Sequence, residues 1–225
     1  MQASRSAHRL SPRLEAVLEE IGTCALLVDL CADHAQLSLA AVARGQARRA
    51  IAIELREAPL LQARRSQRES GVQDRVLLVR GDRLALLRKI DALAIAGVGG
   101  DLAAQLLLDS PDVAHASRVV VQPNRHSREV RAWAHGNGFH IVAERVIAEG
   151  RRLHLVLAFA RRAGVDPAYG AHALEAELEL GPLLLASEQV TARAHLRREL
   201  RRMRALAERR TDLAAALGAL ERRFT

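Results

Sequence analysis

Four acidic side chains stand where short apolar runs of the sequence end. In chain order they are Asp29, Asp33, Glu54 and Asp82. Short continuous apolar runs are typical of buried parallel β-strands, whose carboxyl ends meet along one edge of an open α/β sheet. Ligands bind at that edge, near the point where the strand order reverses. The spacing therefore predicts that these carboxylates face a common binding site.

Three of these carboxylates have a counterpart in a cofactor that contains adenosine. Glu54, at the end of the second predicted strand, is expected to accept hydrogen bonds from the two ribose hydroxyls. Asp82, which follows Gly81, is expected to accept a hydrogen bond from the adenine amino group. Asp29 and the backbone of 31–33 would then face the methionine part of S-adenosylmethionine. A single acid after a strand is commonly a helix N-cap, but several in this order favour a ligand site.

A glycine-rich turn, Gly97-Val98-Gly99-Gly100, follows the fourth predicted strand. Glycine has no Cβ, so this backbone can approach a ligand closely. The fifth predicted strand ends in Gln122-Pro123-Asn124, which places Asn124 at the rim of the site. By contrast, the first turn, within DLCADHAQL (29–37), contains no glycine and lacks the GxGxxG fingerprint. The missing fingerprint disfavours a nicotinamide-dependent dehydrogenase.

Helix-like and strand-like segments alternate through the first part of the chain. Residues 10–21 predict an amphipathic helix, with Ser11 as its N-cap and Pro12 at its first position. The strands expected after it span 24–30, 50–54, 75–80, 90–96 and 117–122. The helices expected between them span 34–44, 57–70, 82–88, 101–109 and 126–136. The segments 139–150 and 152–161 then predict a β-hairpin.

This alternation predicts an α/β fold with a Rossmann-like, mostly parallel sheet and an antiparallel edge hairpin. A nicotinamide-binding Rossmann domain ends in a sixth parallel strand, whereas class I methyltransferases insert an antiparallel seventh strand. The terminal hairpin therefore favours the methyltransferase version of the sheet. We expect this domain to occupy residues 1–165.

No strand-like run appears from about residue 171 onward, and we expect a helical C-terminal domain over 166–225. Residues 171–180 and 182–224 predict helices, the second of them long and rich in arginine. Apolar residues recur along the second helix at spacings of three and four, which is typical of a helical hairpin or a short coiled coil. They are Leu196, Leu200, Met203, Leu213, Leu217, Leu220 and Phe224.

The composition is strongly basic. The formal net charge is +8, the pI is about 11.0, and Lys89 is the sole lysine beside many arginines. Such a charge suggests an anionic partner, with nucleic acid ahead of an acidic membrane surface. The competing explanation is a GC-rich genome that favours arginine and alanine codons.

Cysteine spacing and hydropathy argue against a zinc-binding, a secreted or a membrane-spanning protein. Cys24 and Cys31 form no CxxC pair, and no Cys/His cluster has zinc spacing, so we expect inert thiols and no metal. The N-terminal residues lack the apolar core of a signal peptide, and no run approaches the length of a membrane helix. We therefore expect a cytoplasmic protein with no membrane partner, either monomeric or dimeric through its C-terminal helices.

Several short motifs point beyond the general fold. They are LSPRL (10–14), D-x-x-x-DHA-x-L (29–37), Ala52 to Glu54, IAG-V-GG (95–100), QPN (122–124) and GPLLL (181–185). In these motifs, over nearly its whole length, the chain resembles the bacterial tRNA adenine-22 methyltransferases, the TrmK family. That family methylates ring nitrogen 1 of an adenine in the D-loop region. DHA, IAGxGG and QPN in this order are more specific to it than to methyltransferases in general.

The resemblance implies an S-adenosylmethionine-dependent methyltransferase that acts on tRNA. Asp33 and His34 match the family's Asp-His pair, which implies a catalytic role; Asp33 would orient the adenine amino group and stabilise the developing positive charge. The residues expected to bind cofactor are Asp29, Cys31, Ala32, Glu54, Leu55, Gly81, Asp82, Gly97, Val98 and Gly99. The residues expected to bind substrate are Gly100, Asn124, Arg125 and Arg128. The arginine-rich C-terminal helices would follow phosphates without reading sequence.

Two departures from the family pattern lie in the first turn. Cys31-Ala32 stand where the family has Gly-Ser, and Cys31 fits only if the backbone there tolerates a Cβ. Gln36-Leu37-Ser38 stand where the family has Tyr-Leu-Pro, which removes a ring that could stack on a flipped base. Two alternatives therefore stay open. One is a cofactor-binding methyltransferase with a lost or changed substrate, and the other is a non-catalytic RNA-binding protein that acts through its basic helical tail.

Overall fold

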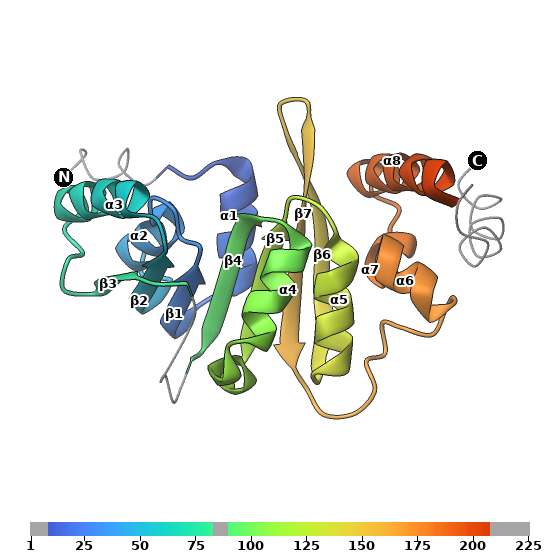
Figure 1. Ribbon diagram of the computed structural model, residues 1–225, viewed down its shortest axis with the longest axis horizontal. Helices are drawn as coiled ribbons and strands as arrows, with labels where there is room; N and C mark the ends of the chain where they lie inside the picture. Colours follow the sequence, from blue (N-terminus) through green and yellow to red (C-terminus); the bar gives the residue numbers. More distant parts are fainter. Residues whose placement is uncertain (1–8, 83–89, 208–225) are drawn as a thin grey trace.

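The computed structural model describes residues 9–82 and 90–207, and within these ranges a seven-stranded sheet forms the centre of the molecule (Figure 1). The sheet has the strand order β3-β2-β1-β4-β5-β7-β6. The strands are β1 (Cys24–Leu30), β2 (Ala47–Glu54), β3 (Val76–Arg80), β4 (Ala92–Val98), β5 (Arg118–Pro123), β6 (Phe139–Glu149) and β7 (Arg152–Arg161). Strands β1 to β5 run parallel, and β7 lies antiparallel to both β5 and β6. The predicted sheet with its antiparallel hairpin is confirmed.

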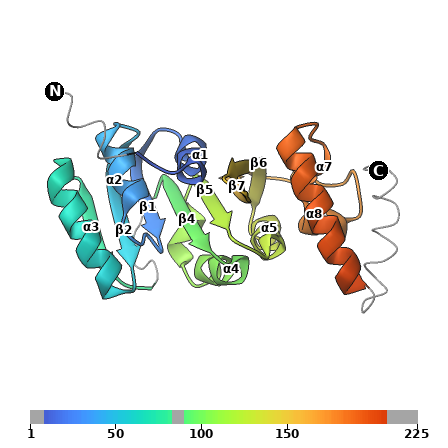
Figure 2. The same cartoon turned by 90° about the horizontal axis from the view of Figure 1, so that it is seen from above.

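Helices cover both faces of this sheet. On one face lie α1 (Pro12–Ile21), α2 (Gln36–Ala43) and α3 (Glu57–Ser70), and on the other lie α4 (Gly100–Leu108) and α5 (Ser127–Gly136) (Figure 2). A short 3-10 helix, η1 (Pro111–His115), follows α4. Because the central strands are covered on both sides, their side chains are apolar on both sides, as the burial of Leu27, Val28 and Leu93 shows.

The strand order reverses between β1 and β4. Val28 of β1 pairs with Ile51 of β2 on one side and with Leu93 of β4 on the other. The connections after these strands therefore leave the sheet in opposite directions, which opens a crevice at the carboxyl ends of β1 and β4. This crevice is where the sequence predicts the binding site.

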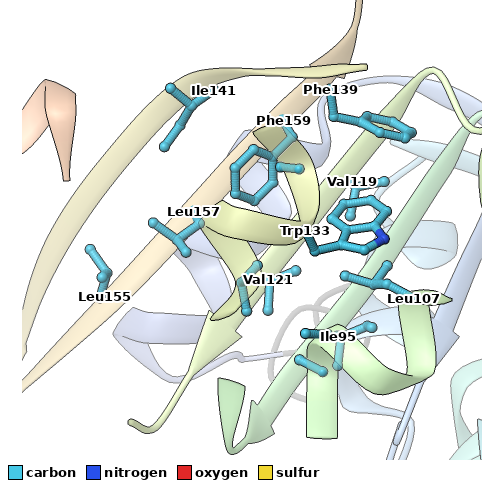
Figure 3. Close-up of a cluster of buried hydrophobic side chains, with 14 of the residues drawn as sticks. Ile95, Leu107, Val119, Val121, Trp133, Phe139, Ile141, Leu155, Leu157 and Phe159 are labelled. Carbon is cyan, nitrogen blue, oxygen red and sulfur yellow. The ribbon is translucent and has the colours of Figure 1, made fainter. Parts of the chain in front are cut away.

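The larger core cluster lies between the sheet and α4 and α5 (Figure 3). Trp133 of α5 stacks on Phe139 of β6, with ring centroids 5.0 Å apart. Aliphatic side chains and one further ring surround this pair. They include Ile95, Leu107, Val119, Val121, Ile141, Leu155, Leu157 and Phe159. Trp133, Phe139 and Phe159, three of the few aromatic residues in the chain, are therefore buried in this core cluster.

The C-terminal segment corrects one prediction from the sequence. The helix expected over 182–224 is interrupted, because α7 (Pro182–Leu185) and α8 (Val190–Ala207) are separate helices that follow α6 (Leu174–Leu180). Between them, the hydroxyl of Ser187 accepts a hydrogen bond from the backbone N–H of Gln189 at 3.2 Å. Serine competes in this way for backbone hydrogen bonds and favours a break before a new helix.

The described part of the predicted apolar seam packs against the body of the molecule. Leu196, Leu200 and Met203 of α8 belong to the same buried cluster as α7 and β6. The rest of that seam, from Leu213 to Phe224, lies outside the described residues. The helix predicted over 82–88 also lies outside them, apart from Asp82. Among the described helices, none is long and apolar enough to cross a membrane.

A buried ion pair fastens the C-terminal helices to the sheet. Nε of Arg131 in α5 lies 2.7 Å from Oε1 of Glu144 in β6, and both side chains are fully buried. Nη1 of Arg131 also donates to the carbonyl of Leu178 near the end of α6. Oε2 of Glu144 accepts hydrogen bonds from the N–H groups of Leu183 and Leu184 at the start of α7. Arg131 thus binds a backbone carbonyl near the end of α6, and Glu144 binds backbone N–H groups at the start of α7. Such groups at helix ends have no partner within the helix.

Gly181, the first residue of the GPLLL motif, lies against this ion pair. Its φ of +96° is a backbone conformation that favours glycine, and a Cβ there would lie 2.5 Å from both carboxylate oxygens of Glu144. It would also lie 2.7 Å from Nη2 of Arg131. Glycine is therefore required at this position by the close approach of the chain to the buried pair.

Candidate cofactor and substrate site

A pocket of about 430 Å³ opens at the carboxyl ends of β1, β2 and β4. This volume lies within the range of small-molecule sites, roughly 300–1,000 Å³. The predicted residues that line it are Asp29, Cys31, Ala32, Asp33, His34, Glu54, Leu55, Gly81, Asp82, Gly97 and Val98. The structure therefore brings together both predicted catalytic residues and all but one of the predicted cofactor residues. The exception, Gly99, lies outside the lining.

Glu54 is held in the pocket by three hydrogen bonds. Its side chain is 5% exposed, and its Oε1 accepts hydrogen bonds from both the N–H and Nε of Arg56, each at 2.9 Å. Its Oε2 accepts one from the N–H of Asp33 at 2.9 Å. Burial would raise the pKa of Glu54, but these hydrogen bonds outweigh it and lower the pKa below its usual value. Glu54 is therefore a carboxylate, aimed into the pocket from the end of β2.

The turn after β1 carries left-handed backbone at three alternate positions. Cys31, Asp33 and Ala35 have φ values of 57°, 49° and 54°. Such values are uncommon for residues other than glycine, asparagine and aspartate. The sequence raised the question of whether the backbone accepts a Cβ at Cys31, and the structure places this residue where glycine is favoured. Burial raises the pKa of the Cys31 thiol to about 11, so it stays protonated.

Asp33 and His34 stand together at the mouth of the pocket. Oδ2 of Asp33 lies 3.5 Å from Nε2 of His34, and both side chains are about half exposed. Oδ1 of Asp33 accepts a hydrogen bond from Nη2 of Arg56 at 3.0 Å. The opposite ring nitrogen of His34, Nδ1, is buried without a hydrogen-bond partner among the described residues. Asp33 and His34 thus form a polar pair among the lining residues of the pocket.

Asp29 occupies the floor of the pocket. It is 2% exposed, and its Oδ2 accepts a hydrogen bond from the hydroxyl of Ser38 in α2 at 2.9 Å. Burial raises the pKa of Asp29 to about 7, and the hydrogen bond from Ser38 offsets only part of this effect. A cationic ligand group would stabilise the charged form of a carboxyl group in such a position, so the pocket floor favours a ligand with a positive charge there.

Two leucines provide exposed apolar surface at the pocket. Leu55, directly after Glu54, is 60% exposed, and Leu102 in α4 is 49% exposed. Both line the pocket. Large apolar side chains held in water beside acidic groups suit a ligand that combines a flat ring with hydroxyl and ammonium groups.

The glycine turn after β4 serves two purposes. Gly97 lines the pocket with a φ of +80°, where other residues are strained. Gly100 begins α4 and is required for a different reason, because a Cβ there would lie 1.9 Å from the carbonyl oxygen of His126. The N–H of Gly100 donates to the carbonyl of Arg125 at 2.8 Å. Gly100 therefore joins the β4 and β5 turns rather than lining the pocket.

Asn124 lies at the rim within a chain of hydrogen bonds. Its Nδ2 donates to the carbonyl of Gly97 at 2.6 Å, and its Oδ1 accepts from Nε2 of the buried Gln122 at 3.3 Å. Oε1 of Gln122 in turn accepts from Nη1 of Arg13 at 2.9 Å. This chain fixes the orientation of the Asn124 amide beside the pocket.

The two arginines predicted to bind substrate have different surroundings. Arg125 lies over Gly99, with its Nε 3.6 Å from where a Cβ would stand. Arg128 instead faces the C-terminal helices, with Nη2 2.8 Å from Glu175 and Nε 3.6 Å from Glu179. Neither side chain lines the pocket. Arg128 is thus already paired with carboxylates, whereas Arg125 lies beside the glycine turn after β4.

Two functional candidates among the pocket residues were not selected from the sequence. Arg13, in α1, lines the pocket, and its Nη1 donates to the side-chain oxygen of Gln122. Its place in the LSPRL motif was the available signal. Arg56 lines the pocket and bonds both Glu54 and Asp33. Its position two residues after the predicted ribose acid offered only a weak signal, because arginine is common throughout this chain.

Comparison with known proteins places this site in a family. A profile described as "Methyltransferase domain" matches residues 10–157. The chain is 34% identical over 179 residues to the tRNA (adenine(22)-N(1))-methyltransferase of Bacillus subtilis, covering 78% of this chain and 75% of that protein. The crystal structure of the B. subtilis M1A22 tRNA methyltransferase TrmK superposes with a TM-score of 0.80 at 29% identity, covering 96% of each chain.

A second solved structure agrees over the same length. It is a putative tRNA (m1A22) methyltransferase of Streptococcus pneumoniae in complex with S-adenosyl-L-methionine, with a TM-score of 0.81 and 26% identity. The match covers 96% of this chain and 100% of that chain. The profile, the identity and the full-length superposition agree with the motifs read from the sequence, and the chain belongs to the TrmK-like family of tRNA (adenine(22)-N(1))-methyltransferases within the class I methyltransferases.

Proposed function

We propose that this protein transfers a methyl group from S-adenosylmethionine to ring nitrogen 1 of adenine 22 in tRNA. The observation that carries the proposal is the pocket at the switch between β1 and β4, where acids from three strand ends face one space. We assign Glu54 to the ribose, Asp29 to an ammonium group, and Asp33 to the incoming base. The family supplies the nucleotide and the position on it.

The residues of the pocket fit the cofactor group by group. Glu54 holds the ribose hydroxyls, Asp82 accepts from the adenine amino group, and the exposed Leu55 and Leu102 cover the two faces of the adenine ring. Asp29 holds the methionine ammonium. Arg13, whose guanidinium lies near Gly97, holds the methionine carboxylate.

Bound S-adenosylmethionine supplies an electrophilic methyl group carried on a sulfonium. Ring nitrogen 1 of adenine is unprotonated at neutral pH, so the protein must position the base and exclude water rather than remove a proton. As this nitrogen forms its bond to the methyl carbon and the carbon–sulfur bond breaks, the ring becomes positively charged. Asp33 accepts a hydrogen bond from the exocyclic amino group and stabilises that charge, and His34 positions Asp33.

We further propose that the C-terminal unit, 166–225, holds the tRNA backbone. Arg197 and Arg201 of α8 are exposed, and neither has an ion-pair partner among the described residues. Free arginines on one helix suit phosphate contacts, which give affinity without sequence reading. The target adenine leaves its stack to reach the pocket.

The decisive experiment supplies labelled S-adenosylmethionine and unmodified tRNA and identifies the product nucleoside. Label in 1-methyladenosine, lost when position 22 of the tRNA is changed from A to G, supports the proposal. Cofactor binding without any labelled tRNA would select a methyltransferase with a changed substrate. Binding of tRNA without cofactor binding would select a non-catalytic RNA-binding protein.

Replacing Glu54 with glutamine is expected to weaken cofactor binding by about tenfold to a hundredfold, because a charged acceptor of two hydroxyl groups is lost. Calorimetric titration of S-adenosylhomocysteine measures this effect. Glu57→Gln is the matched control, since Glu57 is exposed nearby and pairs with Arg80. Equal affinity in wild type and Glu54→Gln would exclude the ribose role.

Cofactor affinity is expected to rise with pH through about pH 7. In the free protein, burial raises the pKa of Asp29 to about 7, so part of the population is protonated at neutral pH. An ammonium beside Asp29 requires the carboxylate, so binding below pH 7 must release a proton, and the affinity levels off above it. Titration in two buffers of different ionisation enthalpy counts the protons. Asp29→Asn should abolish the release, and an undiminished release in that variant would assign it elsewhere.

A further inference from the structure

We propose that the Arg56 side chain acts as a latch, meaning that in the free protein it occupies the position on Glu54 that the cofactor ribose needs. The ribose displaces this side chain when the cofactor binds, and the displacement releases Asp33 for the target base. The inference rests on the proposed function of the pocket and concerns a residue given no role in it. Arg56 bridges the two acids, since its Nε donates to Glu54 and its Nη2 to Asp33.

The hydrogen-bonding capacity of Glu54 shows why the latch must open. A carboxylate has about four lone-pair sites, two on each oxygen. Oε1 already accepts from the N–H and the Nε of Arg56, and Oε2 accepts from the N–H of Asp33. One site is therefore left, whereas a ribose presents two hydroxyl donors.

Of the three donors on Glu54, the guanidinium is the one able to leave. The N–H groups of Asp33 and Arg56 belong to the backbone around the pocket and hold the carboxylate in place. The Arg56 side chain is 67% exposed, so it can swing into water without disturbing packing. Its departure frees the second site on Oε1, and the ribose then bonds one oxygen with each hydroxyl.

The same movement changes the surroundings of Asp33. A guanidinium is planar and rigid, so Nε cannot withdraw from Glu54 without shifting Nη2 away from Asp33. Oδ1 of Asp33, held by Nη2 at 3.0 Å, is then free to accept from an adenine amino group. Cofactor and tRNA each gain from displacing one side chain, so each tightens the binding of the other.

The test compares Arg56→Ala with the control Arg80→Ala, titrating S-adenosylhomocysteine and an analogue that lacks both ribose hydroxyls. Arg80 is a nearby exposed arginine whose Nη1 pairs with Glu57, 3.2 Å away, and not with Glu54. Arg56→Ala is expected to bind S-adenosylhomocysteine about threefold to tenfold more tightly than wild type, the scale of one hydrogen bond with a charged partner. The analogue should gain nothing, and Arg80→Ala should match wild type.

A second measurement follows tRNA affinity with and without saturating S-adenosylhomocysteine. The wild type should bind tRNA more tightly when the product is present, and Arg56→Ala should lose this dependence. Unchanged or weaker binding of S-adenosylhomocysteine by Arg56→Ala would overturn the latch, as would an equal gain for the analogue. Absence of binding by the wild type would instead overturn the proposed function, so the two failures are distinguishable.

Discussion

Replacing Asp33 with asparagine is expected to lower kcat by about a hundredfold or more, the scale seen when one preorganised group facing a developing charge is removed. Asparagine keeps the size of the side chain and tolerates the φ of 49° at this position. The substitution therefore removes the negative charge without moving the turn. Single-turnover methylation of tRNA at saturating cofactor measures the chemical step directly.

Two further measurements separate this role from a structural one. The affinity for S-adenosylhomocysteine should stay within about threefold of wild type, because the backbone N–H of Asp33 still holds Glu54. Asp109→Asn, an exposed acid beside Gln105 at the end of α4, is the matched control and should retain full activity. A kcat near that of wild type would show that Asp33 does not stabilise the reacting base.

Replacing Arg131 with methionine is expected to lower the free energy of unfolding by about 3–5 kcal/mol, because it leaves the carboxylate of Glu144 buried without its cation. Methionine fills much of the same volume, so the effect reflects charge rather than a cavity. Because Arg131 also holds the end of α6 and Glu144 the start of α7, the C-terminal helices should loosen as well. Urea unfolding measures the stability, and limited proteolysis locates the cleavage.

Arg145→Met provides the control for the loss of an arginine on the same sheet. Arg145 pairs with Glu19 and Glu20 of α1 and is 37% exposed, so its loss should cost only about 1 kcal/mol or less. A double substitution, Arg131→Met with Glu144→Leu, should recover part of the loss, since no unpaired charge remains. If Arg131→Met proved no less stable than Arg145→Met, the buried pair would have no special part in holding the tail.

The sheet was predictable because its elements are marked locally. Buried strands appear as short apolar runs, and helices end at glycines such as Gly22 and Gly71, which both adopt positive φ. The acids of the site could be found by the same reasoning, since they stand where the predicted strands end. Glu54 is the clearest case, because one acid at the end of the second strand is sufficient to predict its place.

The contacts that were not predictable depend on distant segments. The Arg131–Glu144 pair joins α5 to β6, and its partners in α6 and α7 lie far along the chain. In a sequence crowded with arginine, nothing local distinguishes Arg131 from its exposed neighbours. The break between α7 and α8 was missed because one helix was extended through ASEQ (186–189), a segment without a large apolar residue, where the hydroxyl of Ser187 accepts a hydrogen bond from the N–H of Gln189 just before α8 begins.

The left-handed turn shows where a family pattern misleads about a particular chain. Glycine at position 31 would satisfy the backbone without strain, yet this chain has Cys31 with a φ of 57°. The conformation is held by its surroundings, since the N–H of Ala32 donates to the carbonyl of Ile53 and that of Asp33 to Glu54. Tertiary hydrogen bonds thus hold Cys31 in a left-handed backbone conformation that a residue with a Cβ disfavours.

The position of Glu144 in the chain has a consequence for synthesis on the ribosome. Its backbone partner Leu183 follows 39 residues later, and at about 5–20 residues per second this delay lasts roughly 2–8 s. During that interval the nascent domain already carries Arg131 and Glu144 but lacks the helix ends that cover them. The last β-strands should therefore complete their folding only after the GPLLL segment emerges, and a ribosome stalled before it would present an unfinished edge to chaperones.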